Sequence, residues 1–588
     1  MSALAAAEGP ALAGVAARRR GARRLASCWA LAALLIAVAA SWLLWASAVP
    51  YGDAPDEPSH VEMARSIAAR GRLPAFGPDA DMYVRLDQAG IPIEPQALAP
   101  PLTYLGDAAL LRVLPVAPPV AARLGSLLAA LAAVALAYAF VRTVLPQQRA
   151  LALPVAALVA ATPQFSFQAA VANSDIFALA AVLAAATLWP RATRPLGALA
   201  FGLALGGALL AKYTAYPAAL AALLAAGWQA WTAAASERPR CARLLRTLQR
   251  LSLVALGAAL VAGPWLAHNW QLYGQPWPLG VADAALRALT PAVGVPGAPM
   301  SRHLWDADYL RSWWAITFRS FWAGFDRVSL FAPGWLYGVL AVGLLGAALG
   351  LARALALPTA RARALALLRG PAGLLLALWA SGTLLATVAQ SLGRYYPVHG
   401  RYLLVLLPLV ALALVAGWRA AVPARWAAPA SWALVASMAA LNAYCLLGIV
   451  VPYYYGPASV RVALTADSPR PGDQAATPLA IRGWAVITGR PAWEPGRVGG
   501  APAWYRPAAS VSVTVDGELP RGLSGGAGVE RPDVARALGE PGTARAGFAY
   551  QWDAHTTPPG VHVLTICAAD PAAAEATCVP LPVRVTSP

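Results

Sequence analysis

Charged side chains are scarce in this chain, and their scarcity excludes a water-soluble enzyme. Only 12% of its 588 residues are Asp, Glu, Lys or Arg, whereas 59% are hydrophobic and the mean hydropathy is +0.56. A typical soluble domain carries about 25% charged residues. Lipid is therefore the solvent that we expect for most of the chain.

Cysteine is rare as well, and its five residues are too few for a disulfide scaffold. Only Cys567 and Cys578 fall in a region that we predict to be soluble and outward-facing. Their spacing suits a short cross-strand disulfide in an oxidising compartment, with two unrelated thiols as the alternative. The sequence also lacks a Gly-rich phosphate loop, a Walker motif, a Ser/His/Asp nucleophile pattern and any apparent internal repeat.

Long apolar runs are what the sequence has instead. A membrane-spanning helix needs roughly 20 apolar residues. We identify eleven such stretches, near 26–49, 120–141, 150–168, 174–190, 195–211, 213–233, 251–270, 328–352, 371–391, 402–417 and 428–450. Only brief interruptions divide 150–190 and 195–233, and merging either pair would invert the sidedness of everything that follows. The predicted fold is mainly α: a polytopic transmembrane helical bundle with a C-terminal antiparallel β-sandwich.

The distribution of arginine supports eleven spans, because short cytoplasmic loops retain basic residues. With the N-terminus inside, the inner segments hold 20 of the 45 basic and two of the 27 acidic residues, which leaves 25 of each sign elsewhere. The net charge of +18 then lies entirely on the inner face. The inner arginines are Arg18, Arg19, Arg20, Arg23, Arg24, Arg142, Arg149, Arg191, Arg194, Arg238, Arg240, Arg243, Arg246, Arg250, Arg353, Arg361, Arg363, Arg369, Arg419 and Arg425.

This charge pattern predicts where the protein resides. The pI near 10.2 reflects membrane topology and not nucleic-acid binding. The first Arg cluster and apolar run resemble a signal peptide, but the run is too long for a typical h-region, so we expect an uncleaved first span. We predict a multi-pass protein of the cytoplasmic (inner) membrane, with a cytoplasmic N-terminus and an extracytoplasmic C-terminal domain.

The predicted domains are a basic N-terminus at 1–25, a transmembrane domain at 26–450, a linker at 451–474 and a β-sandwich at 475–588. Two outer loops, at about 50–119 and 271–327, are large enough to hold a site. The second loop is rich in tryptophan, whose rings we expect at the headgroup level, with stacking on sugars as the alternative. These residues are Trp305, Trp313, Trp314 and Trp322.

The C-terminal region alternates apolar and polar residues in short runs separated by turn residues, which is typical of antiparallel strands. The predicted strands lie at 479–486, 509–517, 547–552, 561–568 and 581–585.

An acidic cluster directly follows the first span, in TyrGlyAspAlaProAspGluProSerHis at 51–60. Ionisable groups near a bilayer are costly, so carboxylates at a span terminus favour a functional interpretation. The alternative is structural. We predict an amphipathic helix at 57–70, and Asp56 can accept hydrogen bonds from its first turn, which Pro58 also favours.

A series of short motifs resembles one family. An Asp-Glu pair after the first span, a His three residues later and GlyArgLeuPro at 71–74 are similar to a bacterial family of polytopic membrane proteins of unassigned function. That family is related to the C-type (GT-C) glycosyltransferases, which include protein O-mannosyltransferases and lipid A aminoarabinose transferases. The further matches are AlaProProLeuThrTyr (99–104), AlaAsnSerAsp (172–175), GlyAlaLeuLeuAlaLysTyrThrAla (207–215), GlyProTrpLeuAlaHisAsnTrpGlnLeuTyrGly (263–274) and HisGlyArgTyrLeuLeu (399–404). ArgGlyTrpAla (482–485), ValAspGly (515–517) and ArgProAspVal (531–534) also resemble a β-domain often appended to bacterial cell-surface glycan enzymes.

The resemblance implies an inverting transfer of a sugar from a polyprenyl-phosphate donor to an extracytoplasmic acceptor, which could be a glycan, a lipid or a protein. Such chemistry needs a carboxylate that accepts the acceptor's proton and cations that neutralise the departing phosphate. Asp56 aligns with the family's catalytic Asp, Glu57 aligns with its neighbour, and Asp53 is the alternative base. A Pro follows the Asp-Glu pair here, in contrast to better-known transferases, so the carboxylate geometry can differ from theirs.

Four residues at predicted outer span ends are candidate ligands for the donor. Lys212 is the only lysine in the chain and could bind phosphate as a point charge, although a snorkelling terminus residue is the alternative. Arg401, beside Tyr402, and Arg394 are further phosphate candidates. Asp175 lies at the membrane edge, where it either belongs to the site or pairs with an Arg or Lys.

Two histidines raise the question of a metal. His60 and His268, with nearby carboxylates, could hold a divalent ion, yet the sequence has no dense ligand cluster and some GT-C relatives work without a metal. We therefore expect no certain cofactor. His268 and Asn269 are expected to form local hydrogen bonds or to contact the sugar.

Two other function classes fit parts of the sequence. A lipid-linked saccharide transporter or flippase would favour charges at mid-membrane depth and repeat symmetry, whereas nearly all charges here lie at span ends. A non-catalytic envelope glycan assembly factor would depend on the sandwich and not on Asp56.

Overall fold

The computed structural model describes residues 26–76, 96–234, 240–281, 305, 307–326, 328, 330–394, 399–455, 461–475, 478–488, 506–538, 541–570 and 576–586. The chain divides into two compact units. The helical unit comprises Met1–Ser47, Ala99–Trp277 and Ala298–Cys445, and the sheet unit comprises Ala48–Leu98, Pro278–Gly297 and Leu446–Pro588. The predicted Arg cluster at 18–24 lies outside the described residues.

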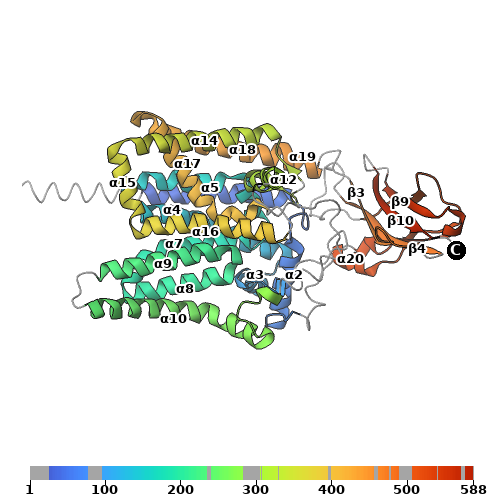
Figure 1. Ribbon diagram of the computed structural model, residues 1–588, viewed down its shortest axis with the longest axis horizontal. Helices are drawn as coiled ribbons and strands as arrows, with labels where there is room; N and C mark the ends of the chain where they lie inside the picture. The colour runs from blue at the N-terminus through green and yellow to red at the C-terminus, as the bar shows by residue number, and fades with distance from the viewer. Residues whose placement is uncertain are drawn as a thin grey trace, which may run out of the picture. The chain divides into compact units, whose positions relative to one another are not determined.

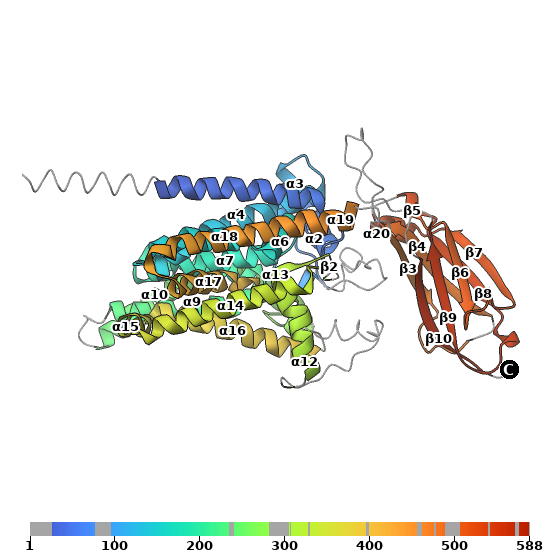
Figure 2. The same ribbon diagram turned by 90° about the horizontal axis from the view of Figure 1, so that it is seen from above.

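Long apolar helices lie side by side in the helical unit (Figures 1 and 2). After a first helix at Ala26–Ala48 come α3 (Leu102–Val113), α4 (Pro118–Val144), α5 (Ala152–Ala161), α6 (Pro163–Ala170), α7 (Asp175–Leu188), α8 (Pro195–Ala211), α9 (Tyr216–Ala233), α10 (Arg240–Tyr273), α12 (Ala307–Ser312), α13 (Arg319–Ala323), α14 (Gly334–Ala356), α15 (Pro358–Leu368), α16 (Pro371–Arg394), α17 (Leu407–Ala421) and α18 (Ala427–Tyr444).

Shorter elements connect or extend these helices. The 3-10 segments are η3 (Arg149–Leu151), η4 (Trp189–Thr193), η5 (Tyr213–Ala215), η8 (Gly400–Leu406) and η9 (Ala424–Trp426). Two π-helical segments are η7 (Trp313–Phe318) and η10 (Cys445–Val450), and a short hairpin pairs β1 (Gly324–Phe325) with β2 (Leu330–Phe331).

The mainly helical membrane fold is confirmed. Among the described residues, eight helices are long and apolar enough to cross a membrane, or nine with the pair α5 and α6, which bends by 65°. Each of the eleven predicted stretches coincides with a helix or a broken helix, but α8 is shorter than a full span and α9 falls outside the group of eight. The number of spans therefore stays a prediction.

Aromatic side chains of the first helix and of α6 pack together in the core. Trp42 and Trp45 are fully buried and meet Phe165 and Phe167, with ring centroids 5.5 Å and 6.3 Å apart. Each indole nitrogen donates a hydrogen bond, from Trp42 to Ser166 Oγ at 3.1 Å and from Trp45 to Asn442 Oδ1 at 2.8 Å. Burying these large rings is therefore not opposed by unpaired N–H groups.

Glycines allow two helices to touch backbone to backbone. A Cβ atom on Gly350 of α14 would lie 2.1 Å from the carbonyl oxygen of Gly417 on α17, so neither position accepts a side chain. This close approach fixes the crossing of α14 and α17. The consequence is that Arg353 and Arg419, which follow on the two helices, lie at the same end of the bundle.

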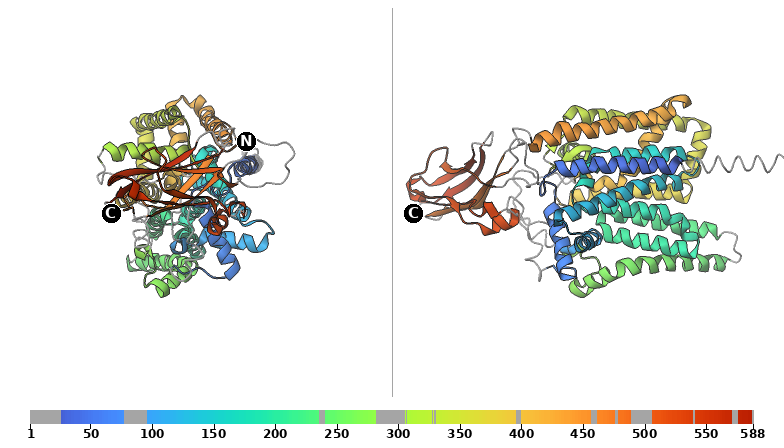
Figure 3. Two further views of the ribbon diagram at one scale, coloured as in Figure 1. Left: turned by 90° about the vertical axis from the view of Figure 1, so that its right-hand side faces the viewer. Right: turned by 180° about the vertical axis from the view of Figure 1, so that it is seen from behind.

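The sheet unit contains α2 (Glu57–Arg70), η2 (Gln96–Leu98), α19 (Val451–Tyr455) and a β-sandwich, seen in two views in Figure 3. Its strands are β3 (Arg461–Ser468), β4 (Leu479–Thr488), β5 (Arg506–Pro507), β6 (Ser510–Val515), β7 (Leu523–Val529), β8 (Gly547–Trp552), β9 (Gly560–Ala569) and β10 (Thr577–Val585), with α20 (Pro532–Leu538), η12 (Pro541–Thr543) and η13 (Ala554–Thr556) between them. One sheet has the order β3-β4-β8-β7, with β5 also paired to β4, and the other has the order β10-β9-β6.

The core of the sandwich lies between these two sheets. Ile481 and Trp552 from one sheet pack with Leu564, Ile566 and Val583 from the other, and all five are buried. All five predicted strands are present. The linker prediction was wrong in part, because β3 occupies 461–468 and pairs with β4, so the sandwich begins before residue 475.

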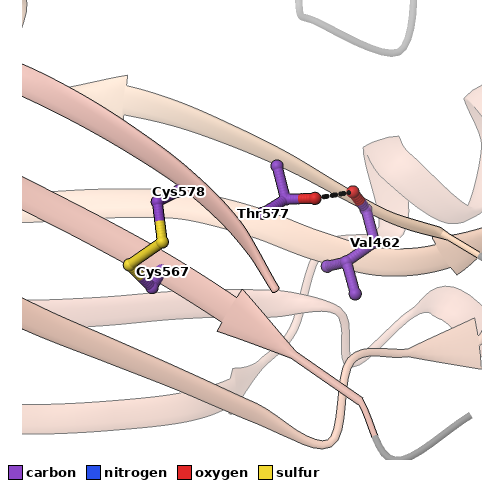
Figure 4. Close-up of a disulfide and its surroundings, with 4 residues drawn as sticks. All are labelled: Val462, Cys567, Thr577 and Cys578. Carbon is purple, nitrogen blue, oxygen red and sulfur yellow. Dashed lines mark hydrogen bonds between the residues drawn. A yellow bond between two sulfur atoms is a disulfide. The ribbon is translucent and has the colours of Figure 1, made fainter. Parts of the chain in front are cut away.

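Cys567 and Cys578 form the disulfide expected from the sequence (Figure 4). They stand directly opposite each other on the antiparallel strands β9 and β10. Beside them, the hydroxyl of Thr577 donates a hydrogen bond of 2.6 Å to the carbonyl oxygen of Val462, which joins β10 to β3. The described free cysteines, Cys28, Cys241 and Cys445, lie elsewhere in the chain.

Replacing both Cys567 and Cys578 with Ala is expected to destabilise the sandwich. Opening a loop with a sequence separation of 11 residues costs about 3 kcal/mol in the chain-entropy description. The measurement is urea-dependent proteolysis of the full-length protein in detergent, with the cleavage followed in the sandwich. The double variant Cys28→Ser/Cys241→Ser removes two exposed free thiols and should leave the midpoint unchanged. Equal midpoints for both double variants would contradict a stabilising disulfide.

Candidate active site

Polar residues gather at the end of the helical unit where α7 and η8 begin and α8 ends, which we call the Asp175 end. Asp175 is the first residue of α7 and is only 2% exposed. One carboxylate oxygen, Oδ1, accepts a hydrogen bond of 2.8 Å from Lys212 Nζ. The other, Oδ2, is buried and has no hydrogen-bond partner among the described residues. A buried carboxylate with one open oxygen can still accept a further polar contact.

Asn173 sets the position of Asp175. Its Oδ1 atom accepts hydrogen bonds from the backbone N–H groups of Asp175 (2.9 Å) and Ile176 (3.2 Å), which satisfies two donors in the first turn of α7. Its amide nitrogen donates to the carbonyl oxygen of Val171 at 2.9 Å, and its backbone N–H donates to Ser126 Oγ at 3.2 Å. Asn173 thus anchors the start of α7 to α4.

Lys212 stands at the break between α8 and α9. Its backbone is extended, with φ −169° and ψ 151°, which ends α8 and turns the chain into η5. The side chain is 19% exposed, and Nζ lies 5.1 Å from the centroid of the Tyr402 ring. Lys212 therefore bridges an anion on α7 and an aromatic face on η8.

Arg401 and Tyr402 approach this pair from η8. The Arg401 guanidinium carbon lies 5.2 Å from the Tyr402 centroid, so the ring contacts two cations, and Arg401 is only 5% exposed. Gly400 makes this placement possible. Its N–H donates to Ser320 Oγ at 2.7 Å, and a Cβ atom there would lie 2.1 Å from the backbone nitrogen of Phe321. Only glycine lets η8 pack this closely on α13.

His268 and Asn269 lie near the C-terminal end of α10. Asn269 is 1% exposed and its side-chain nitrogen donates to the carbonyl oxygen of Pro276 at 3.1 Å. This is the local hydrogen bond expected from the sequence. The Asn269 Oδ1 atom is buried and has no hydrogen-bond partner among the described residues, whereas His268 is half-buried.

The acidic loop after the first helix belongs to the sheet unit. The predicted helix at 57–70 is confirmed as α2. Glu57 is fully buried, and its Oε2 atom accepts a hydrogen bond of 3.1 Å from the backbone N–H of Gly52, which closes the loop over 52–57. Glu57 therefore shapes the loop that carries Asp53 and Asp56.

Asp56 adopts the left-handed conformation, with φ 62° and ψ 4°, and makes no side-chain capping hydrogen bond to α2. The alternative interpretation of Asp56 as a helix cap was therefore wrong. A non-glycine residue at positive φ stores backbone strain, and such residues cluster at functional sites. The role of Asp56 as the base stays a prediction.

The structure brings some predicted site residues together. Lys212 and Arg401 both lie over the Tyr402 ring, and Lys212 also pairs with Asp175. Asp56, Glu57 and the buried His60 belong to the other unit. Arg394 ends α16, and its side chain lies outside the described residues. In the described ranges, no group of three or more His, Cys, Asp or Glu side chains could hold a metal.

The tryptophans of the second outer loop differ in their surroundings. Trp305 and Trp314 are exposed, at 77% and 48%, as a headgroup-level location requires. Trp322 is only 2% exposed and packs edge-on against Phe321, with ring centroids 5.0 Å apart. The headgroup prediction for Trp322 was therefore wrong, because this ring belongs to the protein core.

Sequence analysis missed Asp107 and Thr103, which lie one turn apart on the same face of α3. Both are fully buried, and neither side chain has a hydrogen-bond partner among the described residues. Asp107 contacts Gly125 of α4 so closely that a Cβ atom on Gly125 would lie 2.0 Å from Asp107 Oδ1. Burial raises the pKa of Asp107 to about 8. The carboxyl group is therefore protonated at neutral pH.

Part of this chain is similar to a known protein family. Residues 104–273 match the family model described as dolichyl-phosphate-mannose-protein mannosyltransferase. The match supports a membrane glycosyltransferase, and the matched segment contains Asp175, Lys212, His268 and Asn269.

Two solved structures are similar to this chain. The first is ArnT from Cupriavidus metallidurans bound to undecaprenyl phosphate, at 16% identity and a TM-score of 0.38, over 70% of this chain and 63% of that one. The second is the apo oligosaccharyltransferase of Archaeoglobus fulgidus, at 12% identity and a TM-score of 0.39, over 72% of this chain and 55% of that one. The chain thus spans less than two thirds of either protein. No curated protein sequence matches it.

Proposed function

We propose that this protein is a membrane glycosyltransferase that moves a sugar from a polyprenyl-phosphate donor to an extracytoplasmic acceptor, with inversion and with Asp56 as the base. The observation that carries the proposal is the pair of cations, Lys212 and Arg401, over the Tyr402 ring, with Asp175 bound to Lys212. Lys212 and Asp175 belong to the segment that matches the mannosyltransferase family. Cations at the end of an apolar bundle suit a phosphate whose lipid tail stays in the membrane.

The reaction requires little covalent chemistry from the protein. An acceptor hydroxyl oxygen attacks the anomeric carbon of the donor from the face opposite the phosphate. The bond between this carbon and the phosphate oxygen breaks, and its electron pair leaves with the polyprenyl phosphate. Asp56 takes the hydroxyl proton as the new glycosidic bond forms. Lys212 and Arg401 neutralise the charge that develops on the leaving phosphate.

In the absence of donor, Lys212 forms an ion pair with Asp175. A lone ammonium in this largely buried place would be costly, and the 2.8 Å contact with Asp175 compensates its charge. A donor phosphate competes with Asp175 for the same Nζ protons. The ion pair thus keeps the cation in place between turnovers, and Tyr402 limits the directions in which it can move.

Binding of undecaprenyl phosphate to the purified protein in detergent tests the proposed donor site. Lys212→Met is expected to weaken binding about tenfold to 100-fold, because a charge-assisted hydrogen bond contributes about 1.5–3 kcal/mol. Asp175→Asn should bind at least as tightly as the unmodified protein, since the competing anion is gone. Arg470→Met removes an exposed positive charge from the sandwich and is the control, with unchanged affinity expected.

Lys212→Met leaves Asp175 buried without a cation, which costs about 3–5 kcal/mol and could impair folding. The double variant Lys212→Met/Asp175→Asn removes both charges and keeps the shape of the site. It should elute as a folded monodisperse protein and still fail to bind undecaprenyl phosphate. Full affinity in the double variant would contradict a phosphate site at Lys212.

A further inference from the structure

Arginine gathers at the end of the helical unit opposite the Asp175 end. Arg353 lies in the last turn of α14. The others are Arg361 and Arg363 in α15, Arg369 directly after it, Arg419 in the last turn of α17 and Arg425 in η9. We call this group the arginine end. The segment Gly400–Ala421 joins the two ends over 22 residues, or roughly 30 Å of helix. The arginine end is therefore separate from the candidate active site.

The arginine end has no acidic partner in its own part of the chain. Between Asp326 and Asp467 the sequence contains no Asp or Glu at all. Within the described residues, none of the six arginines forms a salt bridge. Their counter-charge must therefore come from outside this part of the protein.

Two of the six arginines have fixed positions. Arg353 donates a hydrogen bond of 2.9 Å to the carbonyl oxygen of Ala421, the last residue of α17. Arg419 donates to the carbonyl oxygen of Ala427 and to Ser431 Oγ, both at 3.3 Å. These neutral acceptors hold the side chains without neutralising them. The backbone contact between Gly350 and Gly417 brings the two helices that carry them together.

The helix α15 supplies the exposed part of the surface. It crosses the ends of α14 and α16 (Figure 1), and none of its residues is buried in the protein. Arg361 and Arg363 are exposed, and Leu365 and Leu368 are exposed by 39% and 58%. Leucines and arginines on one exposed helix suit the boundary between acyl chains and headgroups.

We propose that the arginine end is a binding surface for anionic phospholipid headgroups, in which α15 lies within the headgroup layer of the leaflet that this end faces. A phosphodiester supplies the missing negative charge, and guanidinium groups bind phosphate oxygens through paired hydrogen bonds. The acyl chains cover the leucines of α15. Binding there holds α14, α15 and α17 together, so the lipid stabilises the bundle from the end remote from the donor site.

Thermal unfolding of the full-length protein in a neutral detergent tests this surface. Added 1-palmitoyl-2-oleoyl-phosphatidylglycerol is expected to raise the melting temperature by about 2–4 °C more than the phosphatidylcholine of the same chains. The triple variant Arg361→Gln/Arg363→Gln/Arg369→Gln should lose this difference, because it removes three basic residues that attract an anionic surface. The matched control Arg470→Gln/Arg482→Gln/Arg584→Gln removes three charges from the sandwich and should keep it.

Two further comparisons, a lysine triple variant and a headgroup without acyl chains, show whether charge and acyl chains are both needed. Arg361→Lys/Arg363→Lys/Arg369→Lys retains the charge and should retain most of the stabilisation. Glycerol 3-phosphate should give no stabilisation at equal concentration, because it lacks acyl chains. The proposal is overturned if phosphatidylcholine or glycerol 3-phosphate stabilises as strongly as phosphatidylglycerol. It is equally overturned if the glutamine triple variant keeps the full difference.

Discussion

Replacing Asp56 with Asn is expected to abolish sugar transfer without disturbing the binding of the donor. Asn keeps the size of the side chain and tolerates positive φ, so the loop conformation at φ 62° should persist. Loss of a general base lowers the rate constant about 100-fold to 10,000-fold. The measurement is transfer from a panel of polyprenyl-phosphate hexoses to an envelope extract, together with the affinity for undecaprenyl phosphate.

Two neighbouring carboxylates provide the controls for this experiment. Asp53→Asn removes the alternative base and should leave transfer largely intact. Glu57→Gln keeps a side-chain acceptor for the Gly52 N–H group, so its effect should be smaller than that of Asp56→Asn. Full transfer by Asp56→Asn would refute the assignment of the base, whereas loss of transfer only in Asp53→Asn would move the assignment to that residue. Neither result would alter the expected phosphate binding by Lys212.

Replacing Asp107 with Asn is expected to change how the stability of the protein depends on pH. In the folded protein the pKa of Asp107 is about 8, against 3.8 for the ordinary side chain. The folded state therefore keeps a proton that the unfolded state has already lost, and stability falls as the pH rises through this interval. Asn does not titrate, so the stability of the variant lacks this decrease with rising pH.

The unfolding free energy of Asp107→Asn, relative to that of the unmodified protein, should rise by about 3 kcal/mol between about pH 6 and about pH 9. Below the pKa of Asp107 the rise is about 1.4 kcal/mol per pH unit. Denaturant unfolding followed by circular dichroism in detergent measures it. Thr103→Val removes the other polar side chain without a hydrogen-bond partner on this face of α3. It should change the unfolding free energy by the same amount at both pH values. A constant difference for Asp107→Asn would show that Asp107 is ionised in the folded state.

The architecture could be predicted from sequence because lipid imposes a simple rule on helices. Each apolar stretch of span length became a helix or a broken helix, and Pro163 with Thr162 explains the bend between α5 and α6. Strands with clear alternation, such as β9, were also predictable. By contrast, β7 has the sequence LeuSerGlyGlyAlaGlyVal, whose glycines weaken any strand signal.

Individual residues of the candidate site could be named from the sequence, but most of their contacts with one another could not. Asp175 begins α7 and Lys212 follows α8, so two consecutive antiparallel helices bring their ends together. This pairing could be predicted, because a basic partner for Asp175 was one alternative in the sequence analysis. The burial of Asp107 could not be predicted, because it depends on the contact of α3 with Gly125 on α4. Local sequence contains no information about that contact.

The single lysine of this chain has a practical consequence. An amine-specific acylating reagent can modify only one side chain, and Lys212 Nζ is held against Asp175 at 2.8 Å and covered by Tyr402. An ammonium held in an ion pair is a poor nucleophile, so the reagent should act slowly on the resting protein. Mass-spectrometric labelling at this one position would therefore report how firmly Lys212 is held in the resting protein, without knowledge of the sugar or of the acceptor.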